Sequence, residues 1–336
     1  MAGLHPQRAR ALVDDHGSAA AVVRAIAEGR VPVPARAGDA VARPIEEVMA
    51  TLRRLEVEAV VRGEPAYPIL LEEIPDPPEV LFVRGPIPGA PAVAVVGTRR
   101  CTAYGRAVAR SYGAAIAAAG WVLVSGLARG IDAEAHRGTV GSGGAGIAVL
   151  GSGPNVVYPA ENRELHDALL EAGGAVVTEY PPGTPPEAWR FPLRNRIIAG
   201  LAAATVVVEA GVTGGALITA SAALEQGRPV LAVPGDIDRA TSEGCNLLIR
   251  DGAIPVLGPK DLVEALSFVL GPPRSRTRPG GSGDEEVLAA MGAVGCSVDD
   301  LVARLGIPPG PVLAALARLE AAGRIMMRGS SVLPAS

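Results

Sequence analysis

The stretch Phe191-Pro-Leu-Arg-Asn-Arg-Ile-Ile-Ala-Gly200 places an aromatic ring close to two guanidinium groups and an amide. Its apolar second half predicts a helix that begins at Arg194, so that Arg194, Asn195 and Arg196 lie at a helix N-terminus. Such an end attracts anions through its free backbone N–H groups and its dipole. Guanidinium forks suit phosphate oxygens, and a nearby ring suits an unstacked base. The stretch points to a phosphate-bearing ligand such as a nucleic acid strand, and a structural Arg–Asn network is the alternative.

Glycine and basic residues also follow several other apolar runs. Gly97-Thr-Arg-Arg100 follows one run, Ser125–Asp132 follows the next, and Glu209–Ala216 follows a later one. Ligands of an open parallel sheet bind outside the carboxyl ends of its strands, and glycines there let the backbone approach a phosphate. We therefore expect a basic, concave strip at one sheet edge, carrying Arg99, Arg100, Arg129, Arg194 and Arg196, with Gly97, Thr98, Gly214 and Gly215 beside them.

The elements that must position these residues follow an alternating pattern. Short apolar runs without polar alternation are typical of strands buried on both faces, and strands that alternate with helices predict a doubly wound sheet. The fold class is thus α/β, with an extended Rossmann-like, mainly parallel sheet. Strands are predicted at residues 91–96, 121–124, 146–150, 175–178, 205–208, 230–233 and 254–257, and helices at 104–119, 159–172, 194–203, 216–226 and 260–270.

Smaller units flank this domain on both sides. Residues 1–62 predict a helical module, with helices at 6–13, 19–26 and 44–55. Residues 63–271 form the Rossmann-like domain. Residues 272–283 are rich in Gly, Pro, Ser and Arg, a composition typical of a flexible linker.

The last part, residues 284–336, predicts a winged helix. Helices are expected at 285–291, 297–305 and 312–322, with Ser297 as an N-cap and a short hairpin after the third helix. The third helix offers only Arg318 among Ala, Leu and Glu, whereas reading duplex DNA needs several Arg, Lys, Asn or Gln side chains. The pattern favours protein contact or regulation over duplex recognition.

Composition and spacing exclude several classes of site. The net charge of −4 argues against a general polyanion binder but permits a local basic groove. Cys101, Cys245 and Cys296 and the four histidines lack metal-ligand spacing, so no metal is expected. No apolar run is long enough for a membrane span and the chain shows no secretory signal, which predicts a cytoplasmic location without membrane contact.

Catalytic motifs are also missing from the sequence. There is no GxGxxG dinucleotide turn, no P-loop and no GxSxG elbow. The acidic residues near the predicted strand ends could include a catalytic pair. We interpret them instead as helix caps and partners for the loop arginines; they are Asp132, Glu179, Glu209, Asp236 and Asp238.

Six motifs, in order and spacing, resemble the DNA-processing protein A (DprA, or Smf) family. They are Gly97-Thr-Arg-Arg with Tyr104-Gly105, Ser125–Ala133, Tyr158-Pro159 with Asn162, Phe191–Gly200, Gly215-Ala-Leu-Ile-Thr219 and Ala232-Val-Pro-Gly235. The likeness runs from about residue 64 to residue 270, and extends to a SAM-like helical N-terminal module, here expected to be truncated, and to a winged helix. The chain departs from the family at Gly214, near which a Ser is usual.

The resemblance implies a non-catalytic protein, without a cofactor, that binds single-stranded DNA. It implies protection of incoming strands in natural transformation, loading of the recombinase RecA onto them, and a homodimer. Carried over to matching positions, the DNA-contacting residues are Gly97, Thr98, Arg99, Arg129, Phe191, Arg194, Asn195, Gly214 and Gly215.

An enzymatic alternative remains at this level. Phosphoribohydrolases that act on nucleoside monophosphates use a similar sheet, with a Gly-Gly-x-Gly-Thr turn and a Glu soon after it. Gly214-Gly-Ala-Leu-Ile-Thr219 has neither that spacing nor the Glu, which favours DNA binding.

Overall fold

The computed structural model describes residues 6–35, 45–271, 287–288, 290–291, 296–305, 309–321, 324–328 and 331–334. By its internal contacts the chain divides into two compact units, Met1–Ser275 and Arg276–Ser336. The expected linker, 272–283, lies outside the described residues, as do residues 306–308 of the expected turn in the second unit. No helix within the described ranges is both long and apolar enough to cross a membrane.

A nine-stranded sheet in the order β1-β2-β6-β5-β4-β3-β7-β8-β9 forms the centre of the first unit. Strands β3 to β9 run parallel, whereas β2 pairs antiparallel with β6, and β1 pairs antiparallel with β2. The strands are β1 Val57–Val61, β2 Val80–Arg84, β3 Ala92–Val96, β4 Val122–Ser125, β5 Gly146–Val149, β6 Ala175–Thr178, β7 Ala204–Val207, β8 Val230–Ala232 and β9 Ile254–Pro255.

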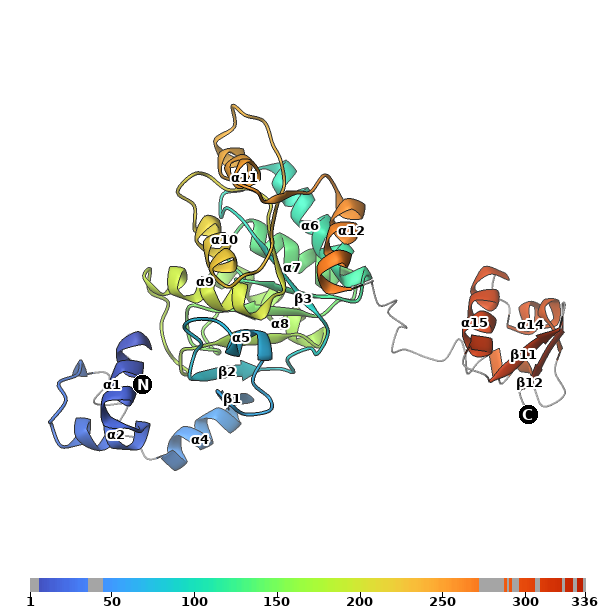
Figure 1. Cartoon of the computed structure of the whole chain (residues 1–336). Helices are drawn as coiled ribbons and strands as arrows, with labels where there is room; N and C mark the ends of the chain where they lie inside the picture. The colour runs from blue at the N-terminus through green and yellow to red at the C-terminus, as the bar shows by residue number, and fades with distance from the viewer. Residues whose placement is uncertain are drawn as a thin grey trace. The chain divides into compact units, whose positions relative to one another are not determined.

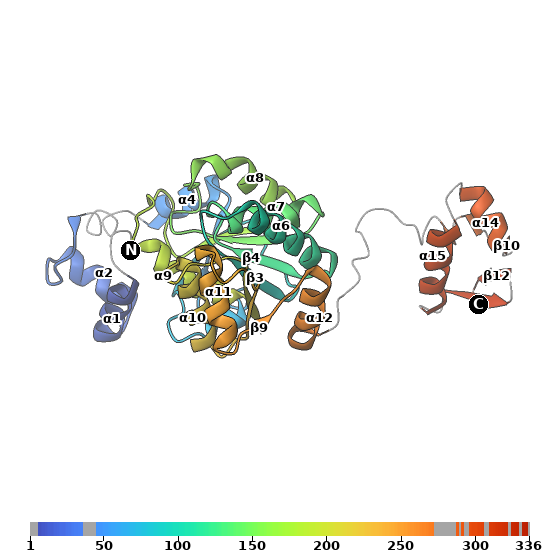
Figure 2. The ribbon, with the colours of Figure 1, turned by 90° about the horizontal axis from the view of Figure 1, so that it is seen from above.

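Helices cover both faces of this sheet (Figures 1 and 2). Apolar side chains of α5, α9, α10 and α11 pack on one face, and those of α6, α7, α8 and α12 pack on the other. The helices are α5 Ile69–Glu72, α6 Ala103–Ala118, α7 Ile131–Gly141, α8 Arg163–Glu171 after the 3-10 turn Ala160–Asn162, α9 Arg190–Leu201, α10 Gly215–Glu225, α11 Ala240–Arg250 and α12 Pro259–Leu270.

Strands β3 to β8 are buried at every residue, which is why the sequence shows them as continuous apolar runs. The predicted α/β class is therefore confirmed. Among the described residues of the first unit, five elements were not predicted: β1, β2, α5, α7 and α11. Strand β1 forms the sheet edge, with two of its five residues buried, and β2 beside it is fully buried only at alternate residues. Helix α5 has only four residues, and α7 and α11 carry Gly, Thr and Ser that weaken a helical pattern.

The chain before the parallel strands begins with helices α1 Pro6–His16, α2 Ala19–Ala27 and α4 Ile45–Arg54, close to the expected ranges. Ser18 caps α2 by accepting a hydrogen bond from the backbone N–H of Ala21. The expected boundary at residue 62 falls after β1, whose residues pair with β2. The large sheet therefore starts before that boundary.

The second unit has the helices and hairpin expected of a winged helix. It contains β10 Cys296–Ser297, α14 Val298–Leu305, α15 Pro309–Ala321, β11 Ile325–Arg328 and β12 Ser331–Pro334, with the three strands in the order β10-β12-β11. Ser297 caps α14 by accepting from the backbone N–H of Asp300 at 3.1 Å. Of the expected helix 285–291, the four described residues are helical.

Candidate nucleic-acid interface

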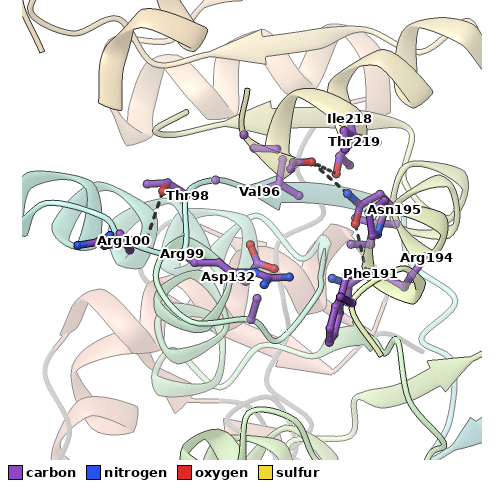
Figure 3. Close-up of a pocket in the computed structure, with 18 of the residues that line it drawn as sticks. Val96, Thr98, Arg99, Arg100, Asp132, Phe191, Arg194, Asn195, Ile218 and Thr219 are labelled. Atoms are coloured by element: carbon purple, nitrogen blue, oxygen red, sulfur yellow. Dashed lines mark hydrogen bonds between the residues drawn. The ribbon is translucent and has the colours of Figure 1, made fainter. Parts of the chain in front are cut away.

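A pocket of about 640 Å³ opens where the order of the parallel strands reverses. Strands β3 and β7 are neighbours, but the chain continues from β3 towards β4 and from β7 towards β8, so a crevice forms outside their carboxyl ends. Figure 3 shows side chains from the β3–α6 turn, α7, α9 and α10 around this crevice. The structure thus brings together most of the predicted residues: Gly97, Thr98, Arg99, Arg100, Phe191, Arg194, Asn195, Gly214 and Gly215 line the pocket.

Arg99 and two aromatic rings form one wall of this pocket. The Arg99 guanidinium lies over the ring of Phe191, 4.9 Å from its centroid. The Phe191 ring in turn lies 5.4 Å from that of Tyr158, tilted by 32°. A cation above an aromatic pair is an arrangement that can contact both a phosphate and a base.

The turn between β3 and α6 carries Arg99 and, next to it, Arg100. The hydroxyl of Thr98 accepts a hydrogen bond from the backbone N–H of Arg100 at 3.2 Å, which closes the turn. Gly97 is required here, because a Cβ atom on it would overlap the side chain of Ile131 at the start of α7. Within the described part of the chain, neither Arg99 nor Arg100 forms a salt bridge. Both charges are therefore available to an anion.

Arg194 is held differently. Only 4% of its surface is exposed, and its Nη1 donates to the backbone oxygens of Gly126 and Val149, which follow β4 and end β5. Burial lowers the pKa of Arg194 to about 10, and the nearby Asp132 carboxylate opposes this shift. Asp132 is itself buried, which raises its pKa, and accepts from the backbone N–H of Gly126 at 3.1 Å. Arg194 thus ties the floor of the pocket together.

The helix that carries Arg194 begins four residues earlier than predicted. α9 starts at Arg190, because Pro192 is tolerated in the first turn of a helix, where its missing N–H is not needed. The expected N-terminal position of residues 194–196 is therefore wrong. Their side chains sit one turn inside the helix, and the free N–H groups of this end belong to residues near Phe191.

Asn195 links α9 to the last wall of the pocket. Its Nδ2 donates to the backbone oxygen of Gly215 at 3.0 Å, at the start of α10. No atom lies within 4 Å of the position that a Cβ atom on Gly215 would take, so the backbone is accessible there. The N-terminal end of α10 therefore offers backbone N–H groups to the pocket.

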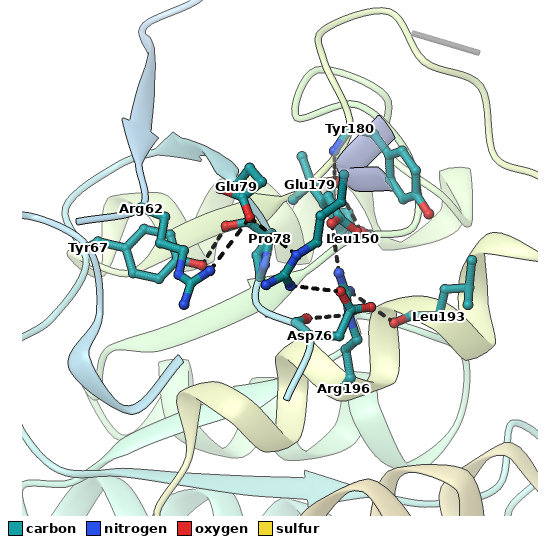
Figure 4. A network of polar contacts seen from close by, with 12 residues as sticks. Arg62, Tyr67, Asp76, Pro78, Glu79, Leu150, Glu179, Tyr180, Leu193 and Arg196 are labelled. Carbon is teal, nitrogen blue, oxygen red and sulfur yellow. Dashed lines mark hydrogen bonds and ion pairs between the residues drawn. The ribbon is translucent and has the colours of Figure 1, made fainter. Parts of the chain in front are cut away.

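Two predicted residues lie away from the pocket's main lining. Arg196 belongs to a polar network in which its Nη2 donates to Glu179 at 2.7 Å and its Nε contacts Asp76 at 3.3 Å (Figure 4). Arg129 lines a smaller neighbouring pocket and forms a two-bond ion pair with Glu161, at 2.7 and 2.9 Å. Both charges are neutralised by carboxylates, in agreement with the interpretation of Glu179 as an arginine partner.

The loop before α9 forms the rim through Pro186 and Ala188. Arg190 holds this loop: its guanidinium lies 5.0 Å from the ring centroid of Tyr180 and 4.9 Å from that of Trp189, and it donates to the backbone oxygen of Pro185. The Trp189 side chain donates from Nε1 to Glu187. One buried cation that contacts both rings therefore holds the rim in place.

Tyr158 contacts the site residue Phe191, but it was not among the predicted site residues. In the sequence it contributed only to the Tyr158-Pro159 motif of the family resemblance. The contact between the two rings, 33 residues apart, places Tyr158 beside Phe191, and no local pattern signals that contact. In the ranges that the structure describes, no three His, Cys, Asp or Glu side chains are grouped as metal ligands would be.

Comparisons with known proteins agree with this architecture. The family model described as "DNA recombination-mediator protein A" matches residues 58–267, and that described as "DprA winged helix domain" matches residues 271–328. The chain is 39% identical to "Protein Smf" of Escherichia coli K12 over 84% of this chain and 79% of that protein. It is 39% identical to "DNA processing protein DprA" of Bacillus subtilis over 66% of this chain and 75% of that protein.

Two solved structures are similar in fold. The structure of DNA processing protein A from Streptococcus pneumoniae matches with a TM-score of 0.59 and 39% identity, over 64% of this chain and 77% of that chain. A structure of DNA processing protein A from Helicobacter pylori, whose description concerns its single-stranded DNA binding mode, matches with a TM-score of 0.55 and 22% identity. It covers 63% of this chain and 96% of that chain, and shows the fold alone.

Proposed function

Because this chain belongs to the DNA recombination-mediator protein A family, we propose that it binds single-stranded DNA in the pocket between β3 and β7. The observation that carries this proposal is the wall formed by Arg99, Phe191 and Tyr158. A single strand exposes both its phosphates and the faces of its bases, and this wall offers a partner for each. A duplex keeps its base faces stacked inside and cannot use the aromatic pair.

Within this pocket, Arg99 and Arg100 hold phosphates, and the start of α10 at Gly214 and Gly215 adds backbone N–H groups. Phe191, which contacts the ring of Tyr158, stacks on a base. None of these contacts distinguishes one base from another, so binding is expected to be independent of sequence and sensitive to salt.

We further propose the role of the chain in the cell from its family. It protects incoming single strands during natural transformation and loads the RecA recombinase onto them, as a cytoplasmic homodimer that performs no catalysis itself. Asp132 is the one acidic side chain that lines the pocket in the described residues, and it is engaged with Gly126. Among those residues, the pocket lining thus contains no second carboxylate to complete an acid–base pair.

Fluorescence anisotropy across a salt series tests the proposal directly. Labelled poly(dT) and a duplex of equal length are titrated with the full chain from low to physiological salt. We expect preferential binding of poly(dT), with an affinity that falls steeply as salt rises.

Two results would contradict this function. Equal affinity for duplex would mean that the aromatic wall does not contact bases. Absence of poly(dT) binding at low salt, combined with hydrolysis of a nucleoside monophosphate in the same preparation, would replace the proposal by the phosphoribohydrolase alternative.

A further inference from the structure

A buried carboxylate holds the turn that carries Arg99 and Arg100. Glu209 follows strand β7 and is 2% exposed. Its backbone oxygen accepts from the N–H of Thr98 at 2.7 Å, and its two carboxylate oxygens accept from Thr102, one from the backbone N–H at 2.9 Å and one from the hydroxyl at 2.5 Å. Glu209 is therefore hydrogen-bonded to both ends of the β3–α6 turn, at Thr98 and at Thr102. Arg99 and Arg100 lie between these two ends.

The fit between Glu209 and this turn is tight. A Cβ atom on Gly105 would overlap the carboxylate, so only glycine permits the approach. The hydroxyl of Thr102 accepts from the backbone N–H of Gly105 at 3.0 Å and is the N-cap of α6. The carboxylate thus lies at a helix N-terminus, where a negative charge is stabilised. Among the described residues, no basic side chain forms a salt bridge with it.

We propose that Glu209 is a positioning residue for the nucleic-acid site: by holding Thr98 and Thr102 it fixes the direction in which Arg99 and Arg100 leave the turn. This inference rests on the proposed function of the pocket. Glu209 does not line the pocket itself. It acts only through the turn, and binding in the pocket is expected to need its hydrogen bonds, not its charge.

Whether DNA affinity rises or falls when Glu209 is replaced separates the effect of its charge from the effect of its hydrogen bonds. If charge alone mattered, replacing Glu209 with a neutral residue would make the arginine turn more attractive to phosphates and would strengthen binding. If Glu209 positions the turn, the same replacement weakens binding despite the gain in positive charge. Glutamine has the same shape, but its NH2 group cannot accept the hydrogen bond that the second carboxylate oxygen accepts.

The experiment compares Glu209→Gln with Glu134→Gln in poly(dT) anisotropy across a salt series. Glu134 is a matched control: its carboxylate is also buried and hydrogen-bonded, here to Arg110 and Arg137 on α6 and α7. Both variants change the net charge equally. We expect Glu209→Gln to bind about fivefold or more weakly, with a salt slope reduced by about 0.7 for each phosphate that is no longer bound. Glu134→Gln is expected to bind as tightly as the wild type or slightly more tightly.

Substitutions at Thr102 keep the test valid if Glu209→Gln folds poorly. Thr102→Val removes the hydroxyl but keeps the shape, and should weaken binding as Glu209→Gln does. Thr102→Ser restores the hydroxyl and should restore the affinity and the salt slope, a rescue that general destabilisation would not produce. In an Arg99→Ala background, Glu209→Gln should weaken binding much less than it does in the wild type, because both changes act on the same interaction with phosphate.

The outcomes distinguish this inference from the proposed function. Wild-type binding that is lost in Arg99→Ala but kept in Glu209→Gln and in Thr102→Val would overturn the positioning role and leave the site intact. Tighter binding by Glu209→Gln would also overturn it. A wild-type chain that does not bind poly(dT) would remove the proposed function, and the inference with it.

Discussion

Two arginines that look alike in the sequence differ in what surrounds them. Arg99 packs on Phe191 and forms no salt bridge with a described residue, whereas Arg194 donates to two backbone oxygens and lies beside the buried Asp132. We propose the ligand contact for the first, whereas the second links the ends of strands β4 and β5. Spacing along the chain could not separate these roles, because the carbonyl partners of Arg194 lie 45 and 68 residues away.

This contrast predicts different consequences for alanine substitutions. Arg99→Ala should weaken poly(dT) binding about tenfold or more, since a hydrogen bond to a charged group is worth about 1.5–3 kcal/mol, and should leave the unfolding transition unchanged. Arg194→Ala should lower the free energy of unfolding by about 3 kcal/mol or more, because it leaves the buried backbone oxygens of Gly126 and Val149 without this donor and removes the cation nearest to the buried Asp132. Urea unfolding and anisotropy on both variants check this. Equal stability losses in the two would contradict the assignment.

A buried histidine gives the fold a predictable response to acid. His136 on α7 is fully buried, and burial lowers its pKa from 6.5 to about 3. Above pH 6.5 the His136 side chain is neutral in both the folded and the unfolded chain. Below pH 6.5 it becomes protonated in the unfolded chain but stays neutral in the folded chain. Stability is therefore lost as the pH falls from about 6.5 towards 3, by up to about 1.4 kcal/mol per pH unit.

The substitution His136→Leu should reduce this loss. Between pH 7.5 and pH 5.0 the wild type should lose about 2 kcal/mol more than the variant, measured by urea unfolding at both values. Burial lowers the pKa of His166 as well, so some acid sensitivity remains in the variant. An identical pH dependence in the two proteins would show that His136 is not the source.

At the scale of elements, the sequence predicted the strands that are buried on both faces of the sheet, but not the edge strand β1. The central strands were recognisable as apolar runs, and with them the loops that meet at one sheet edge. The strand β1 was not predicted because only two of its five residues are buried. The predicted start of α9 was four residues too late because Pro192 lies in its first turn. The pairing of Phe191 with Tyr158 and of Glu209 with Thr102 depends on tertiary contacts that no local pattern records.

The sheet edge at β9 suggests where the proposed homodimer forms. In the described sheet β9 pairs only with β8, and apolar side chains near it are exposed: 79% for Leu257 after the strand and 98% for Phe268 on α12. Strand β9 is too short, and its Pro255 leaves too few donors, for strand pairing, but exposed apolar groups of this size favour association with another chain. We expect sedimentation equilibrium to show dimers for the wild type and monomers for a Leu257→Glu/Phe268→Glu double variant. A wild type that stays monomeric at tens of micromolar would contradict the dimer.

At the scale of the whole molecule, all residues that line the pocket lie between 96 and 219, inside the first unit. The winged-helix unit has its own apolar core, built around Leu301, Leu316 and Ile325. This separation means that the second unit is not needed to form the pocket.

A chain that ends at Gly271 should therefore bind poly(dT) within about twofold of the full chain, at every salt concentration. A chain that ends at residue 283 is the matched control, because it keeps Arg274, Arg276 and Arg278 of the basic tether. Weaker binding by both truncations would assign part of the site to the winged helix. Weaker binding by the shorter one alone would assign it to the tether arginines.

The rim of the pocket also carries an optical signal. The chain has two tryptophans: Trp121 is 2% exposed in the core, and Trp189 is 41% exposed on the loop that Arg190 holds against Tyr180. The emission of an indole depends on the polarity around it, and Trp189 is next in sequence to Ala188, which lines the pocket. We therefore expect a bound strand to change the emission of Trp189 and to leave that of Trp121 unchanged. A change in tryptophan emission on addition of poly(dT) would then report occupancy of the pocket on the unlabelled chain, with Trp121 as the internal reference.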